Sequence, residues 1–313
     1  MNKIGILYGY WCTEWDVDYM PYLEKVKQLG FDTLEINTLS LTKMSAAEIE
    51  HFMGRAKDLR IDVLGVIGVP ANLDPAAPDA AVRKAGVEYE MNLIRTCAKA
   101  GIPCASGVLY SGWLSRLETH GATKAECWKH SISSMKDISA LAEDLGVQLN
   151  LEVVNRFENY LINTCDEVMS YIADVGSPVL YAHLDTFHMN IEENSMSGAI
   201  LAAGSRLGHF HVGENNRKPP GTGFLPWREM VQALKKIDYQ GQIVMEPFVL
   251  SGGTIGREIS VYRDLMPDAD LDAEAVKSLQ FLRNLLYDLG SEIRGLRIRT
   301  NPAILAIQGS DLC

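Results

Sequence analysis

Short apolar runs alternate with longer amphipathic stretches along almost the whole of this 313-residue sequence. The apolar runs are rich in β-branched residues, which is typical of buried strands. We expect eight strands, at residues 4–9, 33–37, 62–68, 104–110, 148–154, 179–185, 207–213 and 242–248. We expect eight helices between and after them, near residues 18–29, 45–59, 80–100, 123–145, 164–174, 196–203, 226–237 and 272–289. Strands that alternate with helices in this way pair in parallel through right-handed crossovers.

Eight such units, with strands too apolar for a sheet that faces water on one side, predict a closed (β/α)8 TIM barrel. Several predicted helices have clear end signals. Ser45 followed by Glu48 resembles a capping box, and Gly30, Gly101 and Gly146 stand where helices commonly end in glycine. An open doubly wound sheet is the alternative, but the first turn, YGYWCTEW, has no GxGxxG motif and argues against a dinucleotide-binding fold.

No change of composition divides the chain, so we expect one catalytic domain over residues 1–290. The tail, residues 291–313, lies outside the eight units and carries three arginines before the apolar stretch AILAI. We give equal weight to three alternatives for this tail: it packs under the barrel, it contacts another subunit, or it is a loose terminus.

Charge and composition restrict the class of protein. A net charge of −11 argues against a nucleic-acid-binding surface, which needs a basic face. The sequence has no apolar run of about 18 residues, so we expect no membrane span. The first residues lack a signal-peptide pattern, and the six cysteines are scattered without a CxxC pair. We therefore expect a cytoplasmic protein with reduced thiols.

Acidic residues and histidines occupy the ends of the last four expected strands. Glu152 comes from the fifth strand, Asp185 from the sixth, His209 or His211 from the seventh and Glu246 from the eighth. The chemistry of α/β barrels takes place at this end of the strands. Three converging carboxylates repel one another, and a divalent cation removes that conflict. Three carboxylates with one imidazole suit Mn²⁺, Mg²⁺ or Co²⁺ better than a structural zinc.

Each of these residues also has a simpler interpretation. A lone aspartate such as Asp185 more often caps a helix or turn, and Glu152 could be a paired core carboxylate. His209 and His211 are two positions apart and share one face of the strand, so the pattern leaves open which of them is a ligand. The coincidence on four adjacent strands favours the metal site.

Four segments resemble one known family. They are LEVVNRFENYL (151–161), LDTFHMNIEE (184–193), GHFHVGENNRKPPGTGFLPW (208–227) and IVMEPF (243–248). They are similar to the ketose 3-epimerases, the group of D-tagatose 3-epimerase and D-allulose (D-psicose) 3-epimerase. The resemblance covers about residues 1–289, and the tail is longer than the family leads us to expect.

The resemblance implies epimerisation of free ketoses at C3, such as D-fructose/D-allulose, D-tagatose/D-sorbose or ribulose/xylulose, through a cis-enediolate. It implies a metal held by Glu152, Asp185, His211 and Glu246, and therefore prefers His211 to His209. Glu152 and Glu246 would also be the two catalytic proton-transfer groups. Mn²⁺ or Co²⁺ is the expected metal, with Mg²⁺ as a further option and no organic cofactor. We also expect a homodimer or homotetramer.

The resemblance further implies that Glu158, His188 and Arg217 bind the sugar. We expect His188 and Arg217 in loops beyond the strand ends, orienting the carbonyl end, while Glu158 holds His188 or a hydroxyl. Other residues would line the sugar or close over it, although aromatic side chains also serve as ordinary barrel packing: Tyr8, Val66, Trp113 and Phe248 in the lining, and Trp15 at the mouth.

Other functions compete with this one. An aldose–ketose isomerase would use the same groups, and a pentulose-phosphate 3-epimerase would bind phosphate at SGGTIGRE (251–258). A metal-dependent DNA-repair nuclease conflicts with the acidic charge. A non-catalytic sugar-binding module should lack at least one of the two proton-transfer glutamates, and both are present.

Overall fold

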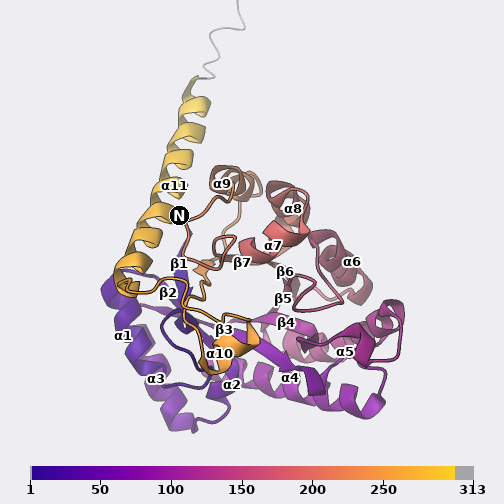
Figure 1. Cartoon of the computed structure of the whole chain (residues 1–313). Helices are drawn as coiled ribbons and strands as arrows, with labels where there is room; N and C mark the ends of the chain where they lie inside the picture. Colours follow the sequence, from indigo (N-terminus) through magenta and orange to yellow (C-terminus); the bar gives the residue numbers. More distant parts are fainter. Residues whose placement is uncertain (1, 300–313) are drawn as a thin grey trace, which may run out of the picture.

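Eight parallel strands close into a barrel in the order of the chain, with helices around the outside (Figure 1). The computed structural model of the chain describes residues 2–299, and side chains as far as residue 287. The last strand pairs with the first, which confirms the (β/α)8 barrel and excludes the open sheet. The strands are β1 (Ile4–Leu7), β2 (Thr33–Asn37), β3 (Asp62–Pro70), β4 (Cys104–Trp113), β5 (Gln148–Val153), β6 (Leu180–Asp185), β7 (Leu207–Val212) and β8 (Ile243–Met245).

All eight expected helices form. They are α1 (Met20–Leu29), α3 (Ala46–Leu59), α4 (Ala80–Ala100), α5 (Lys124–Leu145), α6 (Cys165–Val175), α8 (Met196–Ala203), α9 (Trp227–Lys236) and α11 (Leu271–Arg299). Ser45 and Glu48 form the predicted capping box. Gly30, Gly101 and Gly146 end their helices in the left-handed conformation, which satisfies the last carbonyl groups.

Short helices that the sequence pattern did not predict follow several strands. They are α2 (Thr38–Leu41), α7 (Thr186–Glu192) and α10 (Gly253–Glu258), and 3₁₀ turns lie at Tyr8–Tyr10, Ala71–Leu73, Leu117–Thr119 and Gly204–Arg206. Elements of one or two turns are too short to show a helical period. The expectation that His188 lies in a loop is wrong, because His188 is part of α7.

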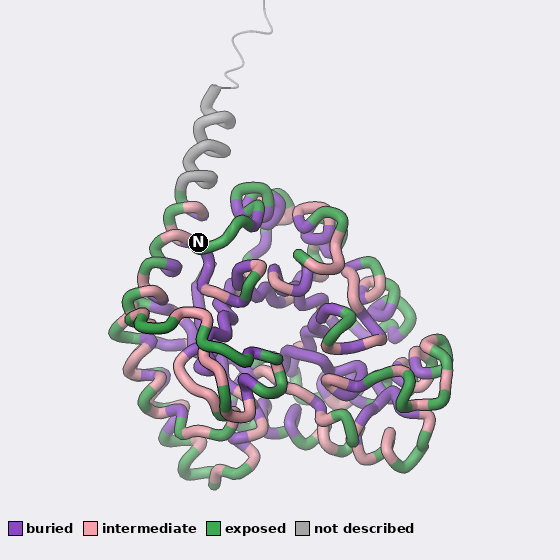
Figure 2. Tube along the Cα trace, viewed as in Figure 1, coloured by how far each residue is buried: buried purple, intermediate pink, exposed green. Residues whose placement is uncertain are grey.

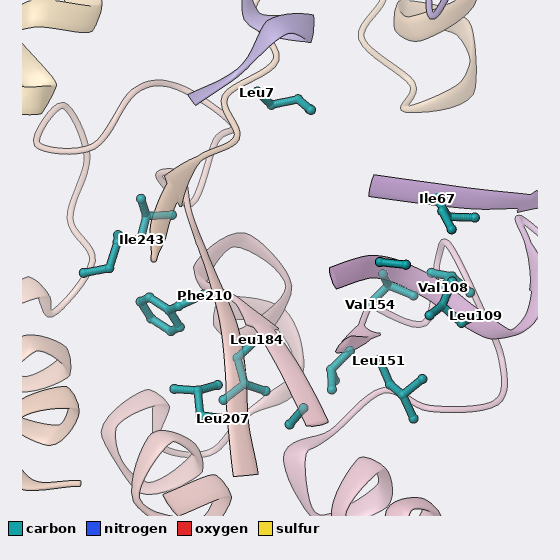
Figure 3. Close-up of a cluster of buried hydrophobic side chains, with 14 of the residues drawn as sticks. Leu7, Ile67, Val108, Leu109, Leu151, Val154, Leu184, Leu207, Phe210 and Ile243 are labelled. Carbon is teal, nitrogen blue, oxygen red and sulfur yellow. The ribbon is translucent and has the colours of Figure 1, made fainter. Parts of the chain in front are cut away.

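Residues alternate between the inside of the barrel and the layer under the helices. On β5, β6 and β7 the buried apolar residues Leu151, Leu184 and Phe210 belong to the hydrophobic core (Figure 3). Their neighbours along the strands are polar and point the opposite way. Burial follows the strands and the inner helix faces, while the outer helix faces are exposed (Figure 2).

The last helix is longer than the helix expected near residues 272–289. Helix α11 continues to Arg299, so residues 291–299 extend the last helix, which projects beyond the ring of helices (Figure 1). Residues 300–313 lie outside the described part, and the role of the tail stays a prediction. No helix in the described part is long and apolar enough to cross a membrane. The five cysteines within it are free thiols.

Gly107 is a position where the barrel tolerates no side chain. Its φ is +128°, and a Cβ there would lie 2.1 Å from the carbonyl oxygen of Ile67 on β3. We expect Gly107→Ala to destabilise the fold by about 1–3 kcal/mol from backbone strain alone, and by more from the overlap. The measurement is the urea midpoint of unfolding. The matched control is Gly54→Ala, at an exposed position of α3 where the added Cβ has nothing within 4 Å. This substitution should be neutral or stabilising. Equal midpoints for both variants would contradict the prediction.

Candidate active site

Four buried side chains meet at the carboxyl ends of the last four strands. Glu152 lies on β5, Asp185 ends β6, His211 lies on β7 and Glu246 directly follows β8. One possible ligand atom from each residue lies within 4.8 Å of those of the other three. The four positions expected from the sequence therefore come together in space.

Asp185 has two functions in this geometry. One carboxylate oxygen, Oδ1, accepts a hydrogen bond from the backbone N–H of Phe187 at 2.8 Å and caps α7. The other, Oδ2, lies 3.2 Å from Nη1 of Arg217 and faces the cluster. The helix-cap interpretation of Asp185 is correct, and it leaves the second oxygen available to the site.

The two histidines of β7 have different surroundings. Nε2 of His211 lies 2.7 Å from Oε2 of Glu35, so its N–H donates to that carboxylate. Nδ1 of His211 is buried, has no hydrogen-bond partner among the described residues, and lies 3.4 Å from Oε1 of Glu246. His209 is outside the four-residue cluster, and its Nε2 lies 2.9 Å from Oε1 of Glu35. The orphaned nitrogen of His211 therefore faces the carboxylates.

The three buried carboxylates differ in how well nearby positive charge compensates their burial. Burial, and then the neighbouring Glu246, raise the pKa of Glu152 well above its usual range. Burial also raises the pKa of Asp185. Burial acts to raise the pKa of Glu246 too, but His211 and Arg217 outweigh it and lower that pKa. Three carboxylates and a free imidazole nitrogen form a donor set that suits a hard divalent cation, so these residues fit a metal ion.

Arg217 lies beside the cluster in a left-handed backbone conformation, with φ at +63°. Its Nη1 donates to Oε2 of Glu246 at 3.0 Å and to Oδ2 of Asp185, while Nη2 donates to Oε1 of Glu158 at 3.3 Å. The guanidinium also stacks on the ring of Phe187 at 3.9 Å. These contacts hold the positively charged guanidinium group of Arg217 at the edge of the acidic cluster.

His188 presents a hydrogen-bond donor to the same space. Its Nδ1 accepts from the backbone N–H of Asn155 at 3.2 Å, so in the neutral ring the proton is on Nε2. Burial, and then Arg217, lower the pKa of His188 to about 3, which keeps the ring neutral. Nε2 lies 3.8 Å from carboxylate oxygens of both Glu152 and Asp185.

Glu158 connects the expected sugar-binding residues. It accepts hydrogen bonds from Nε1 of Trp113 at 3.2 Å and from Arg217, and its Oε1 lies 3.9 Å from Nδ1 of His188. In this geometry Glu158 holds Arg217 and Trp113 more directly than it holds His188.

A cavity of about 380 Å³ opens beside the cluster, with two different sides. The polar side contains Glu152, Glu158, His188, Arg217 and Glu246. Most of the apolar lining comes from the first four strands and the residues near their ends, including Leu7, Val66, Ile67, Val108 and Trp113, although Val154 and Phe248 also contribute. The titratable residues of the lining and most of its apolar residues thus come mainly from opposite halves of the barrel.

The expected lining residues Val66, Trp113 and Phe248 border this cavity, as does Trp15. The ring of Trp15 meets those of Trp113 and Phe248 edge-to-face, and its Nε1 donates to Oε2 of Glu258 at 2.6 Å. Tyr8 is fully buried and does not border the cavity, because its hydroxyl donates to the backbone oxygen of Trp15. The structure places Trp15, rather than Tyr8, next to the sugar-sized space.

Sequence reasoning missed two residues that contact histidines of the site. Glu35 contacts His211, and Asn155 contacts His188. A signal for Glu35 was present, because it is a carboxylate in the middle of the apolar run TLEIN. Asn155 lies inside a matched motif but was not singled out.

Comparison with known proteins identifies the family. The family model described as a xylose isomerase-like TIM barrel matches residues 23–285. The D-psicose 3-epimerase of Ruminiclostridium cellulolyticum is 43% identical over 287 residues, covering 91% of this chain and 98% of that protein. This chain belongs to the ketose 3-epimerase group of that barrel family.

Further relatives agree with this assignment. The L-ribulose 3-epimerase of Mesorhizobium japonicum is 32% identical, covering 86% of this chain and 89% of that protein. A crystal structure of D-psicose 3-epimerase with D-tagatose from Clostridium cellulolyticum superimposes with a TM-score of 0.88 at 43% identity, covering 91% of this chain and 99% of that one. As a member of the ketose 3-epimerase group, the chain is an isomerase of the epimerase class.

Proposed function

We propose that this ketose 3-epimerase family member epimerises free ketoses at C3 with a divalent metal held by Glu152, Asp185, His211 and Glu246. The observation that carries the proposal is the convergence of these four side chains within 4.8 Å, beside a cavity that Glu152 and Glu246 both line. The names of the relatives, D-psicose 3-epimerase and L-ribulose 3-epimerase, support a ketose as the substrate.

Inversion at C3 requires removal of a proton from one face and return of a proton to the other. The bound cation supplies Lewis acidity that makes the C3 proton removable. Glu152 from β5 and Glu246 after β8 take and return the proton on opposite faces, and they exchange roles between the two epimers. Loss of the proton gives a cis-enediolate, toward which Nε2–H of His188 and the guanidinium of Arg217 donate hydrogen bonds.

The segment SGGTIGRE is a poor phosphate site in this geometry, which disfavours the phosphorylated substrate. The backbone N–H and the hydroxyl of Thr254 both donate to Oε2 of Glu14, at 3.3 and 2.8 Å. Glu258 also lies here, paired with Trp15. Two carboxylates therefore stand where a phosphate would need donors, and a free sugar fits the site better.

Product analysis tests the proposed function. The metal-loaded protein is incubated separately with D-fructose, D-tagatose, D-ribulose and L-ribulose, and the products are separated by chromatography. We expect C3 epimers, such as D-allulose from D-fructose. Aldoses as the main products would instead establish an aldose–ketose isomerase. We also propose Mn²⁺ or Co²⁺ as the working metal, a homodimer or homotetramer as the assembly, and the cytoplasm as the location.

Arg217→Ala should separate sugar binding from metal binding. The variant loses charge-assisted hydrogen bonds around the substrate, so we expect kcat/KM to fall about tenfold or more, while the metal content stays that of the wild type. The measurement is steady-state kinetics together with metal analysis. Arg55→Ala is the matched control, because Arg55 makes an ion pair with Glu24 in which both side chains are solvent-exposed, so the protein should tolerate the change. Loss of the metal from Arg217→Ala would show that Arg217 supports the metal rather than the sugar.

A further inference from the structure

The side chain of Glu35, on β2, contacts histidines of β7. It lies in the middle of β2, between Leu7 of β1 and Leu64 of β3 in the strand register, and its side chain is fully buried. A buried carboxylate needs partners. Its partners are on β7, three strands away around the barrel.

The two oxygens of Glu35 contact the two histidines of β7. Oε2 accepts the hydrogen bond from Nε2 of His211 at 2.7 Å, and Oε1 lies 2.9 Å from Nε2 of His209. The 2.7 Å contact is as short as a charge-assisted hydrogen bond from an imidazole N–H to a carboxylate. Glu35 is therefore the acceptor of this hydrogen bond.

An acceptor at Nε2 determines what His211 offers at its other nitrogen. With the proton held on Nε2, the lone pair of neutral His211 is on Nδ1, which faces Glu246 and has no hydrogen-bond partner among the described residues. Such a carboxylate fixes the tautomer and orientation of a histidine ligand and increases its basicity. We propose that Glu35 is a positioning residue that directs Nδ1 of His211 to the metal, an inference that rests on the proposed function.

A neighbouring group offers a competing explanation. His183, His209 and His211 also lie close enough together to hold a cation, and neither ring nitrogen of His183 has a hydrogen-bond partner in the described part. A cation there would compete with Glu35 for Nε2 of His211. The short contact between Glu35 and His211 favours the positioning function, and the metal stoichiometry distinguishes the two.

The test compares Mn²⁺ binding by the wild type and Glu35→Gln, measured by calorimetry and by the electron paramagnetic resonance signal of free Mn²⁺. The amide keeps the size of the side chain but removes the charge that holds the proton on Nε2. We expect the Kd for Mn²⁺ to rise about 10–100-fold, measured well below the melting temperature of the variant, which loses some stability with the buried paired charge. The absorption bands of the Co²⁺-loaded variant should also shift. A purely structural Glu35 would lower the melting temperature and leave the Kd unchanged.

Two further variants sharpen the result. Glu35→Asp keeps the charge but shortens the reach, so it should weaken Mn²⁺ binding in the same direction, and it replaces Glu35→Gln if that variant does not fold. His183→Met is the matched control, because the ring of His183 packs 4.1 Å from that of His211 without a hydrogen bond to it. Its Kd for Mn²⁺ should stay within about threefold of the wild type.

The outcomes separate the inference from the function on which it rests. An unchanged Kd in both Glu35 variants, with the wild type binding one Mn²⁺, overturns the inference alone. Two bound Mn²⁺ in the wild type, one of them lost in His183→Met, overturns it in favour of a cation among the histidines. A wild type that binds no divalent metal overturns both proposals.

Discussion

Glu246→Gln should epimerise ketoses at least about 10²-fold more slowly than the wild type, because the variant loses one of two proton-transfer groups. Glutamine keeps the size of the side chain and an oxygen that can still bind a metal. Glu152, which comes from β5, should still remove the C3 proton from one epimer. A single base exchanges that proton but cannot complete the inversion efficiently.

Deuterium incorporation distinguishes these two reactions. Each variant is incubated in deuterium oxide with each epimer, and hydrogen at C3 is followed by NMR after the metal content has been checked. Glu246→Gln should exchange C3 hydrogen in the epimer served by Glu152, and Glu152→Gln should show the opposite preference. Near-normal epimerisation of both sugars by either variant would show that the glutamate concerned is only a ligand.

Removal of the metal should abolish turnover. The carboxylates of Glu152, Asp185 and Glu246 are buried together, and in the proposed mechanism a divalent cation would both relieve their repulsion and activate the C3 proton. After prolonged chelation and removal of the chelator, we expect no measurable epimerisation, and Mn²⁺ or Co²⁺ should restore it. Because the ligands bind in their deprotonated form, metal affinity should also fall as the pH is lowered. Full activity in a preparation verified to be metal-free would contradict the prediction.

The fold was largely predictable because the strands repeat a strong local pattern. The expected run 33–37 is β2 itself, whereas the expected strand 242–248 is β8 only over Ile243–Met245. Pro247 has no N–H for a strand ladder, so the chain leaves the sheet as Glu246 reaches the site. Pro247 is a signal of this exit in the sequence, but the apolar residues on both sides of it favoured a longer strand.

The residues that cluster at the strand ends could be predicted from the sequence, but the side-chain contacts around them could not. The ends of four strands indicated Glu152, Asp185 and Glu246, because the topology brings these ends together. The choice of His211 over His209 needed the family resemblance, and in the structure it is Nδ1 of His211 that faces Glu246. The contact of Glu35 with His211 joins residues 176 positions apart, and a sequence pattern carries no information about such a pair.

The two-sided cavity has a consequence for how sugar preference can change. We expect substitutions of Val66 or Ile67 to alter which sugars fit, while Glu152 and Glu246, the proposed proton-transfer groups, line the same cavity from the other half of the barrel. Laboratory evolution confined to the first four strands would therefore leave both glutamates in place. Glu35 is the position on those strands to leave unvaried, since its carboxylate accepts a hydrogen bond from His211. We therefore expect that new substrates can be reached by remodelling one half of the barrel while the proposed reaction is retained in the other.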